Sequence, residues 1–447
     1  MYTELLEKNI IISASQLEEI FYSGIKKTKK IGIELEKLPV RKNNFEAVSY
    51  YEQNGICSFL KKYAEIDNWQ NIAVDDNLLG LKSDIGSISL EPGSQFELSL
   101  LPQENIHAIK KNIYFYNQTT ASIANNLDFF WLGYGIQPVS TYHNIDIIPK
   151  KRYEFMTEHL SNVANLPLVM MRETAGIQVA FDYDSEQDAI NKLRLAIKLS
   201  PIISAMYANS PIRNSQDTGY KSFRAKSWLE TDNKRCGLIS EKLFDSNYNF
   251  TFKDYVETLL DVPMIFVQKG DNYFPAPTLT FRNYLKNGYN GYQATLDDWY
   301  LHMNLYFPDV RLSSYIEVRN QDTQRAELIP SIPALWKGIL YNQDAFEAIN
   351  SLLSGFDYQD FLNIRALGPK YGLEFKIKNK NILDIAKEII NISRSSLVEQ
   401  GLGEEIYLEP LANLTNRGLT PADIILKNWY GAWDEDISKL IEYSKLT

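Results

Sequence analysis

The sequence of 447 residues predicts an α+β fold, in a single domain that spans residues 1–447. Helical and strand patterns are interspersed along the chain and do not separate into blocks. The strand patterns have one apolar and one polar face, as the strands of a half-buried antiparallel sheet do. No Gly/Ser tract, proline-rich spacer, charge block or repeat marks a place where the chain divides, so we predict one domain.

Four segments alternate apolar and polar residues, and each is predicted to form a strand: residues 31–36, 94–98, 176–179 and 315–319. Residues i and i+2 share one face of a strand, so Glu34 and Glu36 lie side by side in the first segment. Gln95 and Glu97 are paired in the same way in the second segment. Like-charged neighbours repel each other, which disfavours the strand unless a cation compensates.

Three helices are predicted from capping residues and helical periodicity. Ser185 is an N-cap followed by acidic residues, and apolar residues recur from Ala189 until Pro201 interrupts the pattern. A second amphipathic helix covers about residues 382–401. Thr420 starts a third helix, because a proline and an acidic residue follow it in the first turn. We expect the apolar faces of these helices to pack in the core.

The composition excludes several classes of protein. Lys and Arg number 46 against 56 Asp and Glu, and the net charge of −10 argues against binding to nucleic acid or to an anionic membrane surface. No apolar stretch approaches the roughly 20 residues of a spanning helix. Residues 1–8 lack the pattern of a signal peptide, and the chain has only two cysteines, so the sequence predicts a cytoplasmic protein.

The acidic strand faces leave two interpretations open. One is an antiparallel sheet with a face in water, and the other is a site for divalent cations. Glu91 adds a carboxylate at the turn that leads into the second strand, and Glu317 shares a face with Arg319. Both details favour a cation site. Carboxylates without clustered cysteine select Mg²⁺ or Mn²⁺, whereas the four scattered histidines argue against zinc.

No phosphate-binding loop is present, since its glycine–lysine pattern is absent and Gly133-Tyr134-Gly135 lacks a third glycine. Nucleotide phosphates therefore require metals on carboxylates, together with Arg or Lys. Arginine suits two-point binding of carboxylates and phosphates. The candidate arginines lie in polar or aromatic-rich segments, and they are Arg224 and Arg235 around Trp228, Arg282, and Arg319.

Eight segments occur in an order that resembles a known family. They are IGIELEK (residues 31–37), LEPGSQFEL (90–98), WLGYGIQP (131–138), LDVPMIFV (260–267), TFR (280–282), FPDVRL (307–312), EVR (317–319) and TPA (420–422). In these segments the chain resembles the plant-type glutamate–cysteine ligases, which are also found in bacteria. The likeness extends from about residue 30 to about residue 435.

The resemblance implies a glutamine-synthetase-like catalytic fold, with a curved, mostly antiparallel sheet lined by metal-binding carboxylates and backed by helices. It implies that ATP converts the γ-carboxylate of glutamate to γ-glutamyl phosphate. The amine of cysteine then attacks, giving γ-glutamylcysteine in the first step of glutathione synthesis. Mg²⁺ is the implied cofactor, with Mn²⁺ as an alternative, and ATP is the co-substrate. The expected state is a monomer or homodimer, with no nucleic acid or membrane as partner.

The resemblance also implies roles for individual residues. The implied metal ligands are Glu34, Glu36, Glu91, Glu97 and Glu317. The implied ATP-binding residues are Gln95, Gln178 and Arg319. The implied substrate-pocket residues are Arg224, Trp228, Arg235 and Arg282. Glu36 and Arg319 are the implied catalytic residues, Arg319 because it is placed to neutralise the transferring phosphoryl group.

The sequence departs from the plant pattern in three places. Ser94 occupies the position of the second glycine in the Glu-Pro-Gly-Gly motif. Arg172 and Glu173 lie where plant members have an Arg-Thr-Cys-Thr arrangement, so no role is carried over to either residue. Cys57 and Cys236 do not fall at the positions of the plant regulatory disulfides, so we predict no thiol switch of that type.

Two further hypotheses stay open at this point. A γ-glutamyl ligase with a different amine acceptor would have the same metal and ATP site. A catalytically inactive family member would act as a binding protein. A cluster of like charges costs stability, and its presence in a site without a function argues against this hypothesis.

Overall fold

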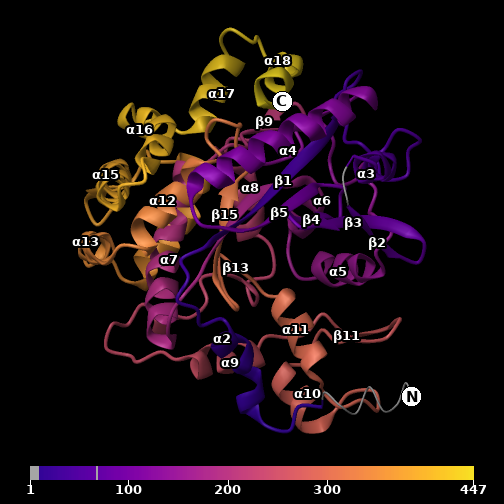
Figure 1. Ribbon diagram of the computed structural model, residues 1–447, viewed down its shortest axis with the longest axis vertical. Coiled ribbons are helices and arrows are strands. Elements are labelled where there is room, and N and C mark those ends of the chain that lie inside the picture. The colour runs from indigo at the N-terminus through magenta and orange to yellow at the C-terminus, as the bar shows by residue number, and fades with distance from the viewer. Residues whose placement is uncertain (1–9, 67–68) are drawn as a thin grey trace.

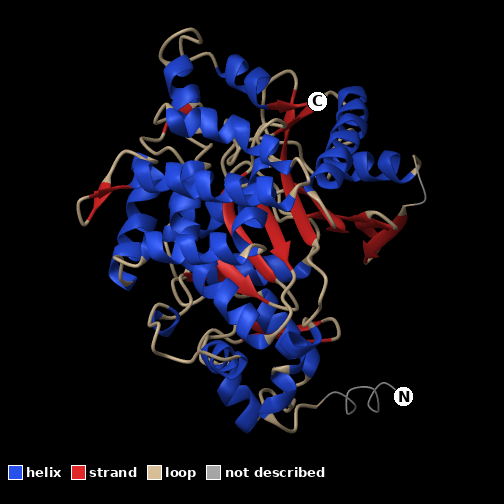
Figure 2. Cartoon of the chain, turned by 60° about the vertical axis from the view of Figure 1, so that its left-hand side comes forward, coloured by secondary structure: helices blue, strands red, loops and turns tan. Residues whose placement is uncertain are grey.

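The computed structural model describes residues 10–66 and 69–447. Residues 1–8, which lack a signal-peptide pattern, lie outside the described residues. A large sheet crosses the middle of the molecule, and helices pack around it (Figures 1 and 2). Among the described helices, none is both long and apolar enough to cross a membrane.

The sheet has ten strands, eight of them in the order β14-β15-β7-β1-β5-β4-β3-β2, while β6 pairs with β1 and β18 pairs with β6. Its neighbouring strands are antiparallel. The predicted α+β fold with a mostly antiparallel sheet is therefore confirmed. The strands are β1 (Ile31–Arg41), β2 (Gln70–Val74), β3 (Asn77–Ser83), β4 (Gly86–Leu90), β5 (Phe96–Gln103), β6 (Phe129–Leu132), β7 (Gly176–Phe181), β14 (Val310–Leu312), β15 (Ile316–Asp322) and β18 (Lys445–Leu446).

The helices form several groups around this sheet, and α9 to α11 lie together at the lower end of Figure 1. The first nine are α2 (Glu19–Ser23), α3 (Ile56–Ala64), α4 (Ile106–Asn126), α5 (Lys151–Ser161), α6 (Pro167–Glu173), α7 (Glu186–Met206), α8 (Phe223–Leu229), α9 (Phe252–Leu260) and α10 (Phe281–Asn287). The others are α11 (Leu296–Asn304), α12 (Ser331–Leu340), α13 (Gln343–Leu353), α14 (Tyr358–Tyr371), α15 (Ile382–Gln400), α16 (Glu409–Asn416), α17 (Pro421–Trp429) and α18 (Ile437–Ser444).

Four small two-stranded sheets lie outside the main one. They are β8 (Ile212–Arg213) with β9 (Gln216–Asp217), β10 (Cys236–Gly237) with β13 (Phe307–Pro308), β11 (Phe266–Lys269) with β12 (Asn272–Pro275), and β16 (Lys376–Ile377) with β17 (Lys380–Asn381). The β10–β13 pair is parallel.

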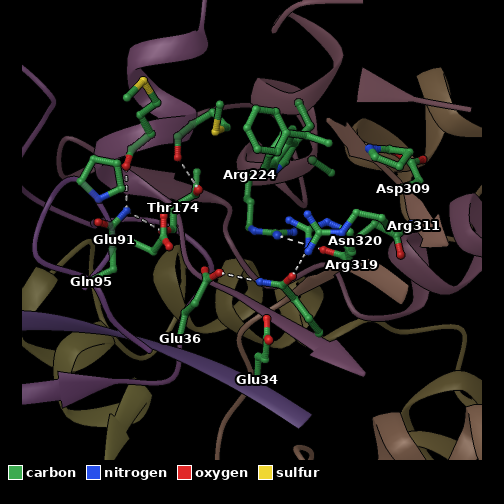
Figure 3. Close-up of a pocket in the computed structure, with 18 of the residues that line it drawn as sticks. Glu34, Glu36, Glu91, Gln95, Thr174, Arg224, Asp309, Arg311, Arg319 and Asn320 are labelled. Atoms are coloured by element: carbon green, nitrogen blue, oxygen red, sulfur yellow. Dashed lines mark hydrogen bonds between the residues drawn. The ribbon is translucent and has the colours of Figure 1, made fainter. Parts of the chain in front are cut away.

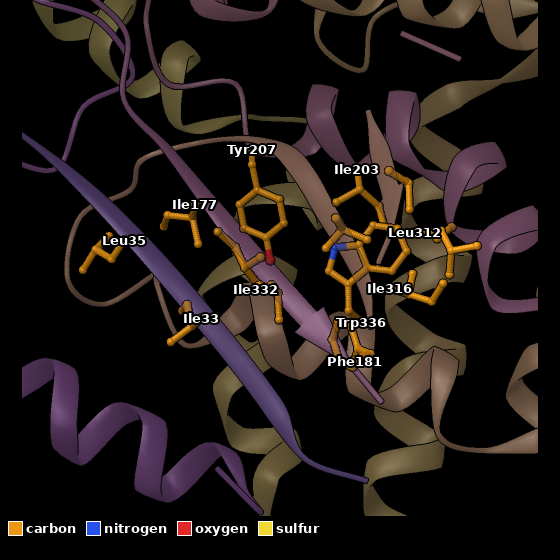
Figure 4. Packing of buried hydrophobic residues seen from close by; sticks show 14 of the residues in the cluster. Ile33, Leu35, Ile177, Phe181, Ile203, Tyr207, Leu312, Ile316, Ile332 and Trp336 are labelled. Carbon is orange, nitrogen blue, oxygen red and sulfur yellow. The ribbon is translucent and has the colours of Figure 1, made fainter. Parts of the chain in front are cut away.

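The central strand β1 separates an apolar face of the sheet from a polar one. Ile33 points to the apolar face, where Ile203 of α7 and Trp336 of α12 belong to the same buried cluster (Figure 4). Glu34 and Glu36 alternate with the apolar residues of β1 and so point to the opposite face. Burial of the apolar face fixes the register of β1, because a slip of one residue would send the glutamates into the core.

Helix α7 is longer than the sequence predicts. The helix continues through Pro201 to Met206, so the predicted interruption at Pro201 is wrong. Proline removes the backbone donor for the carbonyl of Ile197, but the Ser200 hydroxyl donates to that oxygen at 3.1 Å. Ile203 and other apolar residues beyond the proline are buried, and their packing against the sheet keeps the helix intact.

The other predicted elements are present, with small shifts at their ends. The second predicted strand begins at Phe96, because Ser94 adopts a left-handed φ of 68° in the turn before it. Helix α15 ends at a left-handed Gly401, and α17 begins at Pro421 behind a capping box formed by Thr420 and Asp423. The single-domain organisation stays a prediction.

Candidate active site

A cavity of about 360 Å³ lies over the polar face of the sheet, and helices and loops close it from the other side (Figure 3). Its wall has acidic, cationic and apolar regions. The acidic residues include Glu34, Glu36, Glu91 and Glu97, the cations are Arg152, Arg224, Arg311, Arg319 and Arg365, and the apolar residues include Met156, Met170, Met171, Trp228, Leu301, Leu305 and Phe307.

Glu36 lies at the centre of the acidic region. It accepts hydrogen bonds from the backbone N–H of Gly176 at 2.5 Å and from the amide of Gln178 at 3.1 Å. Burial raises the pKa of Glu36 to about 7, against the opposing effect of Arg224 and with a contribution from the charge of Glu91. The Glu36 carboxyl is therefore only partly ionised at neutral pH, and a positive partner would favour its ionised form.

The neighbouring strands bring two more carboxyl groups to this region. Glu97 of β5 lies directly opposite Glu36 in the register of the sheet and accepts from the Ser89 hydroxyl at 2.7 Å. Burial and the charge of Glu34 raise the pKa of Glu97 well above its ordinary value. Burial and the charge of Glu317 likewise raise the pKa of Glu34 to about 7. Carboxylate oxygens brought together in this way are the donors that a hard divalent cation prefers.

The carboxylates are not arranged as a closed metal site. Within residues 10–66 and 69–447, no group of three or more His, Cys, Asp or Glu side chains has the arrangement of a metal site. Carboxylate oxygens are the kind of ligand that Mg²⁺ or Mn²⁺ prefers. These carboxylates, however, are not close enough together to enclose the ion by themselves. A cation shared with the phosphates of a nucleotide needs fewer protein ligands than a cage made by the protein alone.

The two arginines on β14 and β15 form a cationic region beside the acidic one. Arg319 donates to the carboxylate of Glu317 at 2.7 Å and to the amide oxygen of Gln178 at 2.5 Å. Arg311 forms a second ion pair with Glu317 at 2.9 Å. Although burial raises it, the pKa of Glu317 is lowered overall by Arg311 and Arg319. The placement of Glu317 between two arginines favours an ion-pair role over the predicted metal role.

Gln178 connects the two regions of the cavity. Its amide N–H₂ donates to Glu36 and its amide oxygen accepts from Arg319. The side chain therefore fixes the relative position of the acid and the cation that the sequence identifies as catalytic candidates.

Arg224 reaches the cavity from α8 and is almost fully buried. Its Nη2 donates to the carbonyl oxygen of Arg319 at 3.2 Å, while its Nε and Nη1 are buried without a hydrogen-bond partner. Unsatisfied buried donors on a charged group are costly, which indicates that an anion completes them. Trp228, one turn further along α8, lines the cavity with its indole N–H also unpartnered.

The structure does not bring two of the predicted substrate residues to the cavity wall. The guanidinium of Arg235 is buried, paired with Asp232 at 2.7 Å and bonded to two backbone carbonyls. Arg282 forms ion pairs with Glu257 and Asp261 on the surface, where its side chain is 43% exposed. Neither arginine has free donors aimed at the cavity, so we leave both out of the proposed site.

Gln95 lines the cavity, but its amide is already occupied. The amide oxygen accepts from the backbone of Gly93 at 2.7 Å, and the N–H₂ group donates to the carbonyls of Met171 and Thr174 at 3.1 and 3.0 Å. These bonds hold the turn that carries Glu91 against α6. The contacts favour a supporting role for Gln95 over the predicted contact with ATP.

Several residues of the wall are not among those predicted from the sequence. Arg365 of α14 makes a two-point ion pair with Asp309 at 2.8 and 3.0 Å, and Arg152 of α5 lines the acidic side. Asp309 and Arg311 lie two positions apart in the FPDVRL segment, one acidic and one basic. This pattern could have identified them as candidate site residues. Arg365 lies in an ordinary amphipathic helix, and no local signal distinguishes it.

The three departures from the plant pattern have structural counterparts. Glu173 is fully buried and makes a two-point ion pair with Arg213, so it supports the fold away from the cavity wall. Cys57 and Cys236 are free thiols. Ser94 is buried in the turn between β4 and β5, and its hydroxyl has no partner among the described residues.

Comparison with known proteins gives one family and a set of plant relatives. The family model of glutamate–cysteine ligase family 2 (GCS2) matches residues 30–443. The chain is 33% identical over 420 residues to glutamate–cysteine ligase B, chloroplastic, of Oryza sativa subsp. japonica, covering 93% of this chain and 84% of that protein. It is 32% identical over 425 residues to the chloroplastic glutamate–cysteine ligase of Arabidopsis thaliana, covering 94% of this chain and 80% of that protein.

Among solved structures, the chain is similar to a glutamate–cysteine ligase from Francisella tularensis in complex with AMP. The TM-score is 0.55 at 15% identity, with 93% of this chain and 89% of the other covered, which shows a shared fold. The plant relatives contradict the cytoplasmic location predicted from the sequence, because their names place them in the chloroplast. That prediction is withdrawn.

Proposed function

Because this chain belongs to glutamate–cysteine ligase family 2, we propose that it joins the γ-carboxylate of glutamate to the amine of cysteine, with conversion of ATP to ADP and phosphate. The observation that carries this proposal is a single cavity in which carboxylates of the sheet face arginines, two of which, Arg224 and Arg152, have buried donors without a partner. ATP and glutamate are both anions, so a site that brings them together needs cations on both. Arginine side chains supply some of these positive charges, and a divalent ion bound to the carboxylates supplies the others.

The acidic region is the proposed site of Mg²⁺ or Mn²⁺. The residues proposed to hold it are Glu34, Glu36, Glu91 and Glu97. When bound, the cation neutralises the charge of the ATP phosphates and of the phosphoryl group in transfer.

Arg319 is proposed to contact the transferring phosphoryl group. Glu317 and Gln178 hold its guanidinium, so its orientation is set before the substrates bind. A fixed cation stabilises the negative charge that develops on the phosphoryl oxygens and, in the second step, on the departing phosphate. The attacking group is the amine of the second substrate, so the protein needs no nucleophilic side chain.

Arg224 is proposed to bind a carboxylate of the amino-acid substrate. Its Nε and Nη1 are buried without partners, and a carboxylate is an anion that can accept a charge-assisted hydrogen bond from such a donor. Trp228 and other apolar residues line the same cavity and are proposed to shield an acyl phosphate from water.

Product formation tests this proposal directly. Purified protein is incubated with glutamate, cysteine, ATP and Mg²⁺, and phosphate release and γ-glutamylcysteine are measured. We expect Glu36→Gln to lower the rate by about 100-fold or more, since it removes a carboxylate from the centre of the acidic region. Glu388→Gln, on the exposed side of α15, is the matched control and should keep the wild-type rate.

The same assay separates the alternatives, which the comparisons do not support. A panel of amines in place of cysteine identifies a different acceptor, and a faster reaction with another amine would overturn the assignment of cysteine. Equal ATP and Mg²⁺ binding by wild type and Glu36→Gln, with no product from either, would indicate an inactive binding protein.

A further inference from the structure

A buried carboxylate lies behind Arg224, outside the cavity wall. Asp322 is the last residue of β15 and is 1% exposed. Its Oδ2 accepts from the backbone N–H of Asn209 at 2.9 Å and from the Ser210 hydroxyl at 2.7 Å, and its Oδ1 accepts from the Ser222 hydroxyl at 2.9 Å. Asp322 is therefore an acceptor for two hydroxyl protons.

These two hydroxyls connect Asp322 to the start of α8. Each hydroxyl has one proton, so donation to Asp322 leaves its lone pairs free to accept from the helix. Ser222 accepts from the backbone N–H of Ala225 at 2.9 Å as the N-cap of α8. Ser210 accepts from the backbone N–H of Arg224 itself at 3.2 Å. Asp322 thereby fixes the backbone from which the Arg224 side chain extends.

Asp322 also balances the charge of the guanidinium without occupying its donors. Its Oδ1 lies 3.8 Å from Nη1 of Arg224, which is within ion-pair range but too long for a hydrogen bond. Nε and Nη1 of Arg224 are left without a partner. An ion pair at hydrogen-bond distance would have consumed a donor that the ligand needs.

Two glycines leave the space that this arrangement requires. A Cβ on Gly176 would lie 2.3 Å from Nη2 of Arg224, so only glycine lets the guanidinium lie against β7. A Cβ on Gly135 would lie 2.7 Å from Cγ of Asp322. Both glycines have ordinary φ angles and are needed here for space. Glycine at both positions thus leaves room for the Arg224 and Asp322 side chains where they lie.

From this geometry we propose that Asp322 is a positioning residue, which acts through Ser210, Ser222 and the ion pair to hold Arg224 with donors free for a substrate carboxylate. The proposal rests on the proposed function, since it takes the ligand of Arg224 to be the amino-acid substrate. Asp322 itself touches no substrate. Its loss is therefore expected to weaken binding of glutamate and to leave the ATP side of the cavity unchanged.

The test compares Asp322→Asn with Arg224→Ala and with the double variant. The amide of asparagine turns one acceptor into a donor and removes the charge opposite Arg224. We expect KM for glutamate to rise about 10- to 100-fold in Asp322→Asn, with KM for ATP close to wild type. In the Arg224→Ala background the second substitution should change KM for glutamate by less than about twofold, because Asp322 acts only through Arg224.

A control variant separates positioning from loss of stability. Asp298→Asn removes another buried carboxylate that accepts from a helix-cap hydroxyl, that of Thr295, away from the cavity. It should lower the melting temperature without raising KM for glutamate. If Asp322→Asn does not fold, Ser210→Ala removes one hydroxyl of the same network and is expected to raise KM for glutamate in the same direction.

Two results would overturn the proposal. The first is a folded Asp322→Asn or Ser210→Ala variant whose KM for glutamate is unchanged. The second is an additive effect, in which Asp322→Asn raises KM for glutamate as much in the Arg224→Ala background as in wild type. Calorimetric titration with glutamate separates this failure from failure of the proposed function. Wild type that forms γ-glutamylcysteine while Asp322→Asn binds glutamate normally refutes only the role of Asp322. Wild type that neither binds glutamate nor forms product refutes both.

Discussion

Replacing Ser94 with glycine is expected to stabilise the protein. Ser94 has a φ of 68°, in the left-handed region that costs a residue with a Cβ about 1–2 kcal/mol. Its hydroxyl is buried and has no partner among the described residues, and an unmet group of this kind costs about 1–3 kcal/mol. The greater freedom of glycine in the unfolded chain offsets about 0.5–1 kcal/mol. The net gain is therefore about 1–4.5 kcal/mol.

Thermal unfolding followed by circular dichroism measures this effect. Ser87→Gly is the matched control, since Ser87 lies in β4 with an ordinary φ, and there glycine should destabilise by about 0.5–1 kcal/mol. Ser94 is not on the cavity wall, so ligase activity should be retained. A Ser94→Gly protein that melts at or below the wild-type temperature would refute the assignment of strain and of an unmet hydroxyl to this turn.

Five residues and the divalent cation are the subject of the remaining predictions. Arg319→Met should destabilise by about 1.5–3 kcal/mol in thermal melts, because Glu317 loses one charge-assisted hydrogen bond while Arg311 still pairs with it, and a smaller loss in Arg319→Met/Glu317→Met would confirm the cause. Because the folded-state pKa values of Glu34 and Glu36, about 7, exceed the ordinary 4.5, stability in EDTA should fall as pH rises from about 4.5 to 7. Added Mg²⁺ should reduce that fall, and a melting temperature equally pH-dependent with Mg²⁺ would contradict the cation site. Arg282→Ala should leave KM for glutamate unchanged, and an increase would restore the substrate role predicted from the sequence.

The contacts of Glu36 show which features of the site the alternating strand pattern predicts and which it does not. Alternation in residues 31–36 correctly predicted that Glu34 and Glu36 share a polar face. It did not predict that Glu97 would lie opposite Glu36 or that Gln178 would lie opposite Glu34. The order of strands in the sheet decides those contacts, and strands β1 and β7 are far apart in the sequence.

The sequence by itself determined the local features of this protein. The cap at Thr420 and the polar faces of the strands depend on residues within a few positions of one another, and the ordered motifs identified the family. Only the tertiary structure decided that Pro201 lies inside a helix, since Ser200 and the packing of the sheet compensate for the lost donor.

The tertiary structure also decided which arginines reach the cavity. Arg224 and Arg319 line it, whereas Arg235 and Arg282 pair elsewhere. The four are alike in sequence because each lies in a polar or aromatic-rich segment. A guanidinium pairs with the acceptors that folding of the chain brings near it. In the network behind Arg224, for example, Asp322 and Ser222 are 100 residues apart in the sequence. Contacts at that separation leave no local pattern, so the sequence could name the candidates but could not choose among them.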